Sequence, residues 1–141
     1  MTLQNTPMEA ESDFTLAIRV VMMPRDVNKY GTIFGGVILS YIDQAGFIEA
    51  RHHGMHRWLT ASIERVDFNA PVLVGDIVGL YTRTESTGRS SVKINVRVEA
   101  ERFQTRDVVP VTQASLTMVA VDKTGHSIPF DSPPTVGNDA T

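Results

Sequence analysis

Asp43 is the side chain with the clearest potential for chemistry in this sequence. It lies within residues 37–50, a run that is largely apolar and interrupted by a few polar residues such as Ser40. A carboxylate in the middle of a buried helix costs free energy unless it is paired or hydrogen-bonded, and enzymes use such groups as bases or nucleophiles. A structural Asp43, bonded to Ser40 or to a backbone group, explains the pattern equally well.

Gly35 and Gly36 immediately precede this run, and Asn28 lies in the loop before them. The N–H groups at the start of a helix have no acceptor within the helix, and the helix dipole is positive there. Such groups can stabilise an oxyanion that forms during a reaction. Ordinary turns are nevertheless the commoner reason for a Gly-Gly pair.

A second polar cluster, Gly88-Arg89-Ser90-Ser91, lies where two predicted strands meet. It combines a glycine that permits close approach with a guanidinium and two hydroxyl groups. These groups suit a phosphate or a pyrophosphate. A pattern of only four residues is more often a polar hairpin turn.

The remaining polar residues give weaker signals. His52, His53 and His56 cluster after the predicted helix, but they lack a carboxylate at ligand spacing and an HExxH motif, so we expect no metal site. The sequence alone assembles no Ser-His-Asp triad. The absence of cysteine excludes thiol nucleophiles and disulfides. Glu64 is most simply a surface charge, although beside a reaction site it would compete with Asp43 as general base.

Length and composition limit the class of protein. A chain of 141 residues with 42% hydrophobic and 21% charged residues fits one globular domain. The net charge of −3 argues against nucleic acid as a partner. The run around Asp43 is too short and too polar to span a bilayer, so we expect no membrane insertion. Residues 1–13 lack the features of a signal peptide, which predicts a cytoplasmic protein.

The hydrophobic pattern predicts one helix and five strands, at residues 14–23, 58–68, 76–85, 90–103 and 109–121. The fourth strand alternates cleanly between a buried and a wet face. In the second strand the residues expected to face inward are Leu59, Ala61, Ile63 and Val66. An α+β fold follows, in which a curved antiparallel sheet wraps around the helix. One sheet cannot cover an apolar helix on all sides, so we expect a dimer with the two helices side by side.

Four collinear segments carry a family resemblance: NKYGTIFGGVILSYIDQAG, TASIERVDFNAPVLVGDIV, TGRSSVKINVRVEAE and VTQASLTMVAVDKTG. In this order and spacing, the chain resembles the bacterial acyl-CoA thioesterases of the hotdog fold, the branch that also includes the cytosolic acyl-CoA hydrolases of animals. The resemblance implies a hotdog domain over residues 14–128. Residues 1–13 would be a flexible N-terminus and residues 129–141 a mobile C-terminal tail.

The resemblance also implies roles for particular residues. Asp43 matches the base or nucleophile of the family, and Asn28 matches its partner in the site. Gly35 and Gly36 match the glycines that polarise the thioester carbonyl. Val37 stands where close relatives often carry a larger aromatic residue, which predicts a different shape for the acyl pocket.

The CoA part of the substrate would be bound elsewhere on the chain. Residues 88–91 match the family segment near the pantetheine and phosphates of CoA, and Thr60 is expected on the CoA side with them. The implied reaction is hydrolysis of acyl-CoA to a carboxylic acid and CoA, which needs no metal and no redox cofactor. The alternatives are a non-catalytic acyl-CoA binding module and a hydratase or dehydratase. A dehydratase would want a histidine near the helix, and none lies between Asn28 and Arg51.

Helix geometry predicts that each site is shared by two subunits. Gly35 and Asp43 are eight residues apart, which is about 12 Å along a helix axis at roughly 1.5 Å per residue. One thioester carbonyl needs its donors and its base within about 3 Å. Two antiparallel helices across a two-fold axis would bring Asp43 of one chain to Asn28 and the glycines of the other. We expect from this geometry a homodimer as the minimal unit. The family resemblance adds the expectation that these dimers assemble into a hexamer, as a trimer of dimers.

Overall fold

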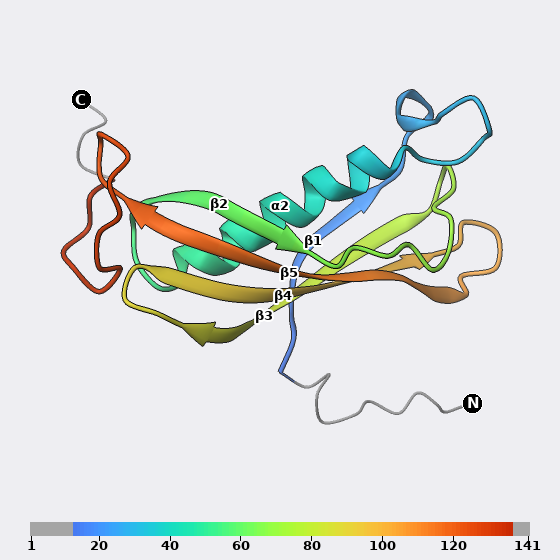
Figure 1. The fold of residues 1–141 in the computed structure, drawn as a ribbon. Helices are drawn as coiled ribbons and strands as arrows, with labels where there is room; N and C mark the ends of the chain where they lie inside the picture. Colours follow the sequence, from blue (N-terminus) through green and yellow to red (C-terminus); the bar gives the residue numbers. More distant parts are fainter. Residues whose placement is uncertain (1–12, 137–141) are drawn as a thin grey trace.

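One helix crosses one face of a five-stranded antiparallel sheet (Figure 1). The computed structural model describes residues 13–136. The helix is α2 (Gly35–Arg51), and the strands are β1 (Thr15–Val21), β2 (Arg57–Glu64), β3 (Ile77–Thr87), β4 (Ser91–Glu101) and β5 (Val108–Val121). The strand order is β1-β3-β4-β5-β2, which leaves β1 and β2 as the edges. The predicted helix and strands are all confirmed, with small shifts at their ends.

Helix α2 is buried along one stripe and not on all sides. The residues that face the sheet recur at helical spacing and are Ile38, Ile42, Ala45, Gly46 and Ala50. Gly46 permits close approach of the helix to β5, because a Cβ atom there would lie 3.0 Å from Cδ2 of Leu116. On another side of the helix, Leu39 and Phe47 stay exposed. One chain therefore leaves part of this apolar helix uncovered, as the sequence predicts.

Strand β4 lies at the centre of the sheet and confirms the predicted alternation. Its fully buried residues are Val92, Ile94, Val96, Val98 and Ala100. Asn95, on the face expected to be wet, is nevertheless buried. Its Nδ2 donates hydrogen bonds to Glu85 Oε1 at 2.8 Å and to Ser115 Oγ at 3.1 Å. These bonds satisfy the buried amide.

The predicted orientation of β2 is wrong for the single chain. Trp58 is the buried residue of this strand, with 6% exposure, whereas Leu59 and Ile63 are 52% and 37% exposed. The strand bulges between Thr60 and Ser62 and ends at Glu64, where the prediction continued it to residue 68. A period of two shows which side chains share a face, but it does not show which face the rest of the chain covers.

The chain after β5 packs against the domain as far as Val136. Ser127 bridges back to Val121, and the backbone N–H groups of Thr135 and Val136 donate to Met55 O. The tail expected at 129–141 is thus in contact with the domain over 129–136, while residues 1–12 and 137–141 lie outside the described residues. Within the described chain, no helix is long and apolar enough to cross a membrane.

Candidate functional site

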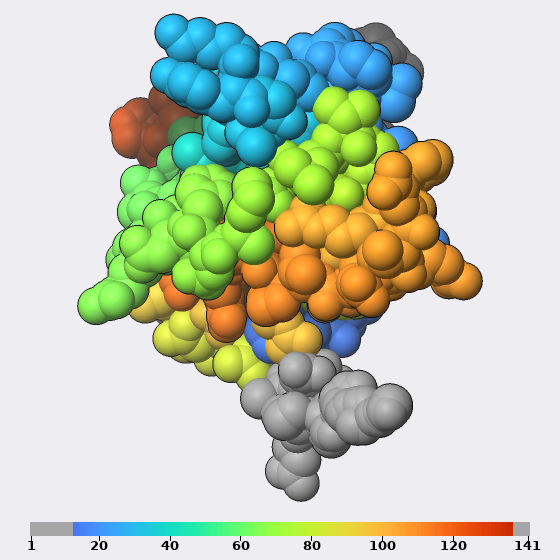
Figure 2. Space-filling view, turned by 90° about the vertical axis from the view of Figure 1, so that its right-hand side faces the viewer, coloured from blue at the N-terminus to red at the C-terminus, as the bar shows by residue number. Residues whose placement is uncertain are grey.

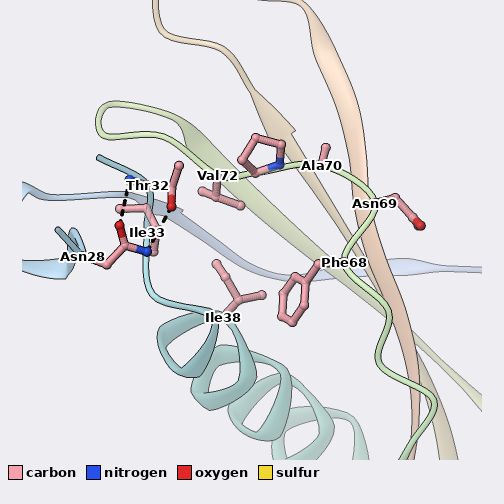
Figure 3. A pocket seen from close by; sticks show the side chains of 10 residues that line it. Asn28, Thr32, Ile33, Ile38, Phe68, Asn69, Ala70 and Val72 are labelled. Atoms are coloured by element: carbon pink, nitrogen blue, oxygen red, sulfur yellow. Dashed lines mark hydrogen bonds between the residues drawn. The ribbon is translucent and has the colours of Figure 1, made fainter. Parts of the chain in front are cut away.

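A pocket of 380 Å³ opens beside the start of α2. Its walls come from the loop before the helix, from the first turn of the helix and from the segment that follows β2 (Figure 3). Figure 2 shows these two chain segments, in blue and in light green, meeting at this end of the molecule. The lining residues are Asn28, Thr32, Ile33, Gly35, Ile38, Phe68, Asn69, Ala70, Pro71 and Val72.

Asn28 holds the loop before α2 in shape. Its Oδ1 accepts hydrogen bonds from the backbone N–H groups of Tyr30 at 2.8 Å and Thr32 at 3.2 Å. Its Nδ2 donates to Thr32 Oγ1 at 3.0 Å. An amide NH₂ carries two hydrogens, so one donor of Asn28 remains available in the pocket that it lines.

Gly35 and Gly36 begin α2 and present free N–H groups. No side chain caps the helix start, and no acceptor within residues 13–136 bonds to these two amides. A Cβ atom at Gly36 would meet no atom within 4 Å, and one at Gly35 would meet only the Phe68 ring, at 3.6 Å. Packing inside the described chain therefore does not require glycine here, and a ligand has room to approach the backbone.

Asp43 lies two helical turns further along α2 and does not line this pocket. It is partly exposed, and Thr60 Oγ1 on β2 donates a hydrogen bond to its Oδ1. Thr60 Oγ1 also contacts Met118 Sδ at 3.3 Å. Ser40, the structural partner considered for this carboxylate, instead accepts a hydrogen bond from Gln44 Nε2 at 3.2 Å. The link between Asp43 and Thr60 spans 17 residues and was not foreseen from the sequence.

The segment 88–91 forms the hairpin turn between β3 and β4, at the end of the molecule opposite the loop that precedes α2 (Figure 1). Gly88 N donates to Ser91 O at 2.8 Å, which closes the turn. Arg89 is exposed. Across β5, Ser91 pairs with Val119, one residue from the Met118 that faces Thr60. Along the direction of the strands, this turn therefore lies nearer to Asp43 than to Gly35 and Gly36.

The other predicted side chains take structural positions. Glu64 is 54% exposed in its side chain and lies 3.9 Å from Lys93 Nζ, as expected for a surface charge. His53 Nε2 bonds to Thr84 Oγ1 at 2.8 Å. His56 is buried against the C-terminal segment. Within residues 13–136, no three His, Asp or Glu side chains gather as metal ligands would.

Phe68 and Asn69 line the pocket but were not foreseen as site residues. They lie in the quoted segment TASIERVDFNAPVLVGDIV. The available signal was the Asn-Ala-Pro turn after an apolar residue, which on its own is typical of any loop. Only the return of this segment to the start of α2 gives these residues a place in the pocket.

Known proteins are similar to this chain in sequence and in fold. The family model of the thioesterase superfamily matches residues 30–104. The chain belongs to the thioesterase superfamily. A curated relative in it, the acyl-CoA thioester hydrolase YciA of Salmonella typhimurium, is 34% identical over 132 residues, which are 92% of this chain and 96% of that protein.

Solved structures of this superfamily have the same fold. A hexameric hotdog fold thioesterase of Campylobacter jejuni matches with a TM-score of 0.77 at 38% identity, covering 82% of this chain and 89% of that one. A hexameric broad specificity acyl-coenzyme A thioesterase, solved as a mutant with an aspartate replaced by alanine, matches with a TM-score of 0.79 at 36% identity over 89% and 90% of the chains. The predicted α+β hotdog fold is confirmed.

Proposed function

We propose that this member of the superfamily hydrolyses acyl-CoA thioesters and that Asp43 is its general base or nucleophile. The observation that carries the proposal is the partly exposed Asp43 carboxylate with a threonine hydroxyl bonded to one oxygen. The name of the Salmonella relative supports the substrate class. The solved aspartate-to-alanine mutant of another relative is consistent with an important aspartate in such proteins.

In the general-base route, Asp43 takes a proton from water while the water oxygen bonds to the thioester carbon. The carbonyl oxygen becomes an oxyanion, which the N–H groups of Gly35 and Gly36 stabilise. The C–S bond then breaks, the sulfur of CoA leaves and is protonated, and the acyl group departs as the carboxylic acid. In the nucleophilic route, Asp43 attacks the carbon first, and water hydrolyses the resulting anhydride. Neither route uses a metal or a redox cofactor.

Each site would use two chains. Asp43 and Gly35 are about 12 Å apart along α2, at roughly 1.5 Å per residue, so one carbonyl cannot reach both in the same chain. In an isologous dimer with antiparallel helices, the pocket of one chain faces Asp43 of its partner. The free amide hydrogen of Asn28 would then point toward the water or the carbonyl.

The surface around Asp43 supports such a dimer. Leu39, Asp43 and Phe47 are spaced four residues apart, so two exposed apolar side chains flank the carboxylate on one stripe of α2. The neighbouring strand β2 is an edge strand and exposes Leu59. Exposed apolar side chains beside a free strand edge are typical of an interface. Since both solved relatives are hexameric, we infer a hexamer built as a trimer of dimers.

CoA would extend from the thioester toward the hairpin turn at 88–91. Arg89 is exposed there, with the hydroxyls of Ser90 and Ser91 beside it. A guanidinium and hydroxyl groups are suited to the phosphates of CoA. Thr60 lies on β2, across β5 from the start of β4, and would contribute to the chemistry through its hydrogen bond to Asp43. We place the protein in the cytoplasm, because a chain without cysteine suits a reducing compartment.

A thiol-release assay over a panel of acyl-CoAs tests the proposal. Hydrolysis of at least one chain length, with loss of the activity in Asp43→Ala, is the expected result. Tight binding of acyl-CoA without release of CoA thiol would instead identify a binding module. Single-turnover hydrolysis in oxygen-18 water separates the two routes, since label enters the Asp43 carboxylate only if an anhydride forms.

A further inference from the structure

Residues 127–136 form a strap across one end of the domain, which we call the C-terminal strap. It begins where Ser127 bridges to Val121 and Ile128 N donates to Ala120 O at 2.9 Å. It ends where Thr135 N donates to Met55 O at 2.9 Å. In Figure 1 this segment, in dark red, lies at the same end of the molecule as the turn between β3 and β4. Nothing in the proposed chemistry uses the strap.

His56 fastens the C-terminal strap at two points. Its side chain is buried, with 3% exposure of the residue. Nε2 lies 2.8 Å from Phe130 O, and Nδ1 lies 2.9 Å from Thr135 Oγ1. A carbonyl oxygen can only accept, so Nε2 carries the hydrogen in this contact, and in the neutral ring Nδ1 accepts from the threonine hydroxyl. Both ring nitrogens are therefore used to hold the strap.

The packing around Phe130 is tight. A Cβ atom at Gly54 would lie 2.6 Å from Phe130 O and 2.8 Å from the His56 ring, which excludes any side chain at position 54 without a shift of the strap. The Phe130 ring also packs against the rings of Trp58, at 6.3 Å between centroids, and His53, at 5.7 Å. These contacts fix the position of Phe130 relative to the sheet.

Phe130 connects the strap to the proposed CoA-binding turn. Its N–H donates to Arg89 O at 3.2 Å, while its own carbonyl oxygen accepts from His56. The next carbonyl of the turn, that of Ser90, accepts instead from Ala120 N on β5, at 2.9 Å. Within residues 13–136, the only hydrogen bond to the backbone carbonyl of Arg89 therefore comes from the strap.

We propose that His56 and Phe130 are positioning residues for CoA, which act by holding Arg89 in the conformation that meets the phosphates. This inference rests on the proposed role of the 88–91 turn. An exposed hairpin turn that is held in place before binding loses less conformational freedom when the ligand arrives. Neither residue would touch the reacting thioester, so the strap should affect binding of the nucleotide end and leave the chemical step unchanged.

The test compares an acyl-CoA with the corresponding acyl-pantetheine, which has the same thioester and lacks the nucleotide phosphates. His56→Ala and Gly54→Ala should raise KM for acyl-CoA about fivefold or more, the effect of losing one to two hydrogen bonds. Neither kcat nor the kinetics with acyl-pantetheine should change. His56→Gln, whose amide can both donate and accept, should restore part of the loss. The matched control is His126→Ala, because His126 is exposed and bonds to Thr124 outside the strap.

The outcomes separate this inference from the proposed function. An equal rise of KM for both substrates, or no rise for acyl-CoA in folded His56→Ala and Gly54→Ala, overturns the positioning role. If His56→Ala does not fold, Gly54→Ala and the milder Thr135→Val decide by the same comparison. Arg89→Ala should show the same selectivity for acyl-CoA. If Arg89→Ala does not raise KM selectively for acyl-CoA, the proposed contact between Arg89 and CoA is wrong. If Arg89→Ala raises KM only for acyl-CoA and His56→Ala has no effect, only the proposed role of the strap is wrong.

Discussion

At the scale of single residues, the bond between Thr60 and Asp43 organises the proposed chemistry. Asp43 is on α2 and Thr60 is on β2, so the contact joins two elements that expose apolar side chains. A hydroxyl that donates to one carboxylate oxygen leaves the other oxygen for water or substrate. The pair thus resembles a base with its orienting group.

The first prediction concerns the base. Asp43→Asn, which keeps the size of the side chain and removes its basicity, should lower kcat about a hundredfold or more, while circular dichroism and the melting temperature stay close to those of the parent. Glu64→Gln is the control, because Glu64 is an exposed acid paired with Lys93. Near-normal thiol release by Asp43→Asn, with loss in Glu64→Gln, would transfer the role to Glu64.

The second prediction concerns the orienting hydroxyl. Thr60→Val removes the donor at nearly constant volume and should lower kcat about tenfold, in line with the loss of one hydrogen bond to a carboxylate. KM for acyl-CoA should stay nearly constant, and Thr60→Ser should keep most of the activity. A selective rise in KM for acyl-CoA, with kcat preserved, would instead assign Thr60 to CoA binding.

At the scale of elements, the close packing of α2 on β5 sets the position of Asp43. Ile38, Ile42 and Ala45 anchor one stripe of the helix in the core. Gly46 lets the helix approach Leu116, which is fully buried. Fixing this stripe against the sheet directs the side chain of Asp43 toward β2, because side chains on one helix have fixed angular relations.

The third prediction tests this packing. Gly46→Val introduces carbon atoms where Leu116 already lies and should lower the free energy of unfolding by about 2 kcal/mol, a typical cost of overpacking. Denaturant unfolding followed by circular dichroism measures the change. The double variant with Leu116→Ala should lose less stability than the two single changes added together, since the truncated leucine leaves room. Strict additivity would mean that the helix and β5 are not in close contact at this point.

At the scale of the whole molecule, the two groups of residues that the proposed site needs lie apart within one chain. The pocket with Asn28 and Gly35 lies beside the start of α2, and Asp43 lies further along the helix. Assembly is therefore part of the proposed function, and the fourth and fifth predictions concern it.

The fourth prediction uses subunit mixing. Asp43→Ala and Asn28→Ala homodimers should each be nearly inactive. After exchange, each mixed dimer should contain one intact site and one with both defects. Random exchange makes half of the dimers mixed, so about a quarter of the parent activity should return. Exchange confirmed by native mass spectrometry without recovery of thiol release would exclude the shared site.

The fifth prediction identifies the interface. Leu59→Lys places a charge on the exposed apolar face of the edge strand β2 and should dissociate the dimer, with loss of activity at low protein concentration. Sedimentation velocity measures the oligomeric state. Leu16→Lys is the matched control, since Leu16 is a similarly exposed residue on β1, the opposite edge. Dissociation by Leu16→Lys alone would place the two-fold interface at β1.

The sequence by itself determined the elements and the main candidate for catalysis. Helical spacing in residues 37–50, period-two alternation in β4 and the glycines before α2 are local patterns, and local patterns follow from backbone geometry. Asp43 was identifiable because a carboxylate is out of place in an apolar run. The family resemblance predicted the fold and the reaction class, because it extends over most of the chain.

Only the tertiary structure decided the contacts between distant residues. Thr60 donates a hydrogen bond to Asp43, and Trp58 is buried where Leu59 is exposed. Phe130 forms hydrogen bonds with both His56 and Arg89. The physical reason is that each of these contacts depends on which faces of helix, sheet and strap meet. Periodicity marks the faces of an element, but the packing of the whole chain determines which partner each face receives.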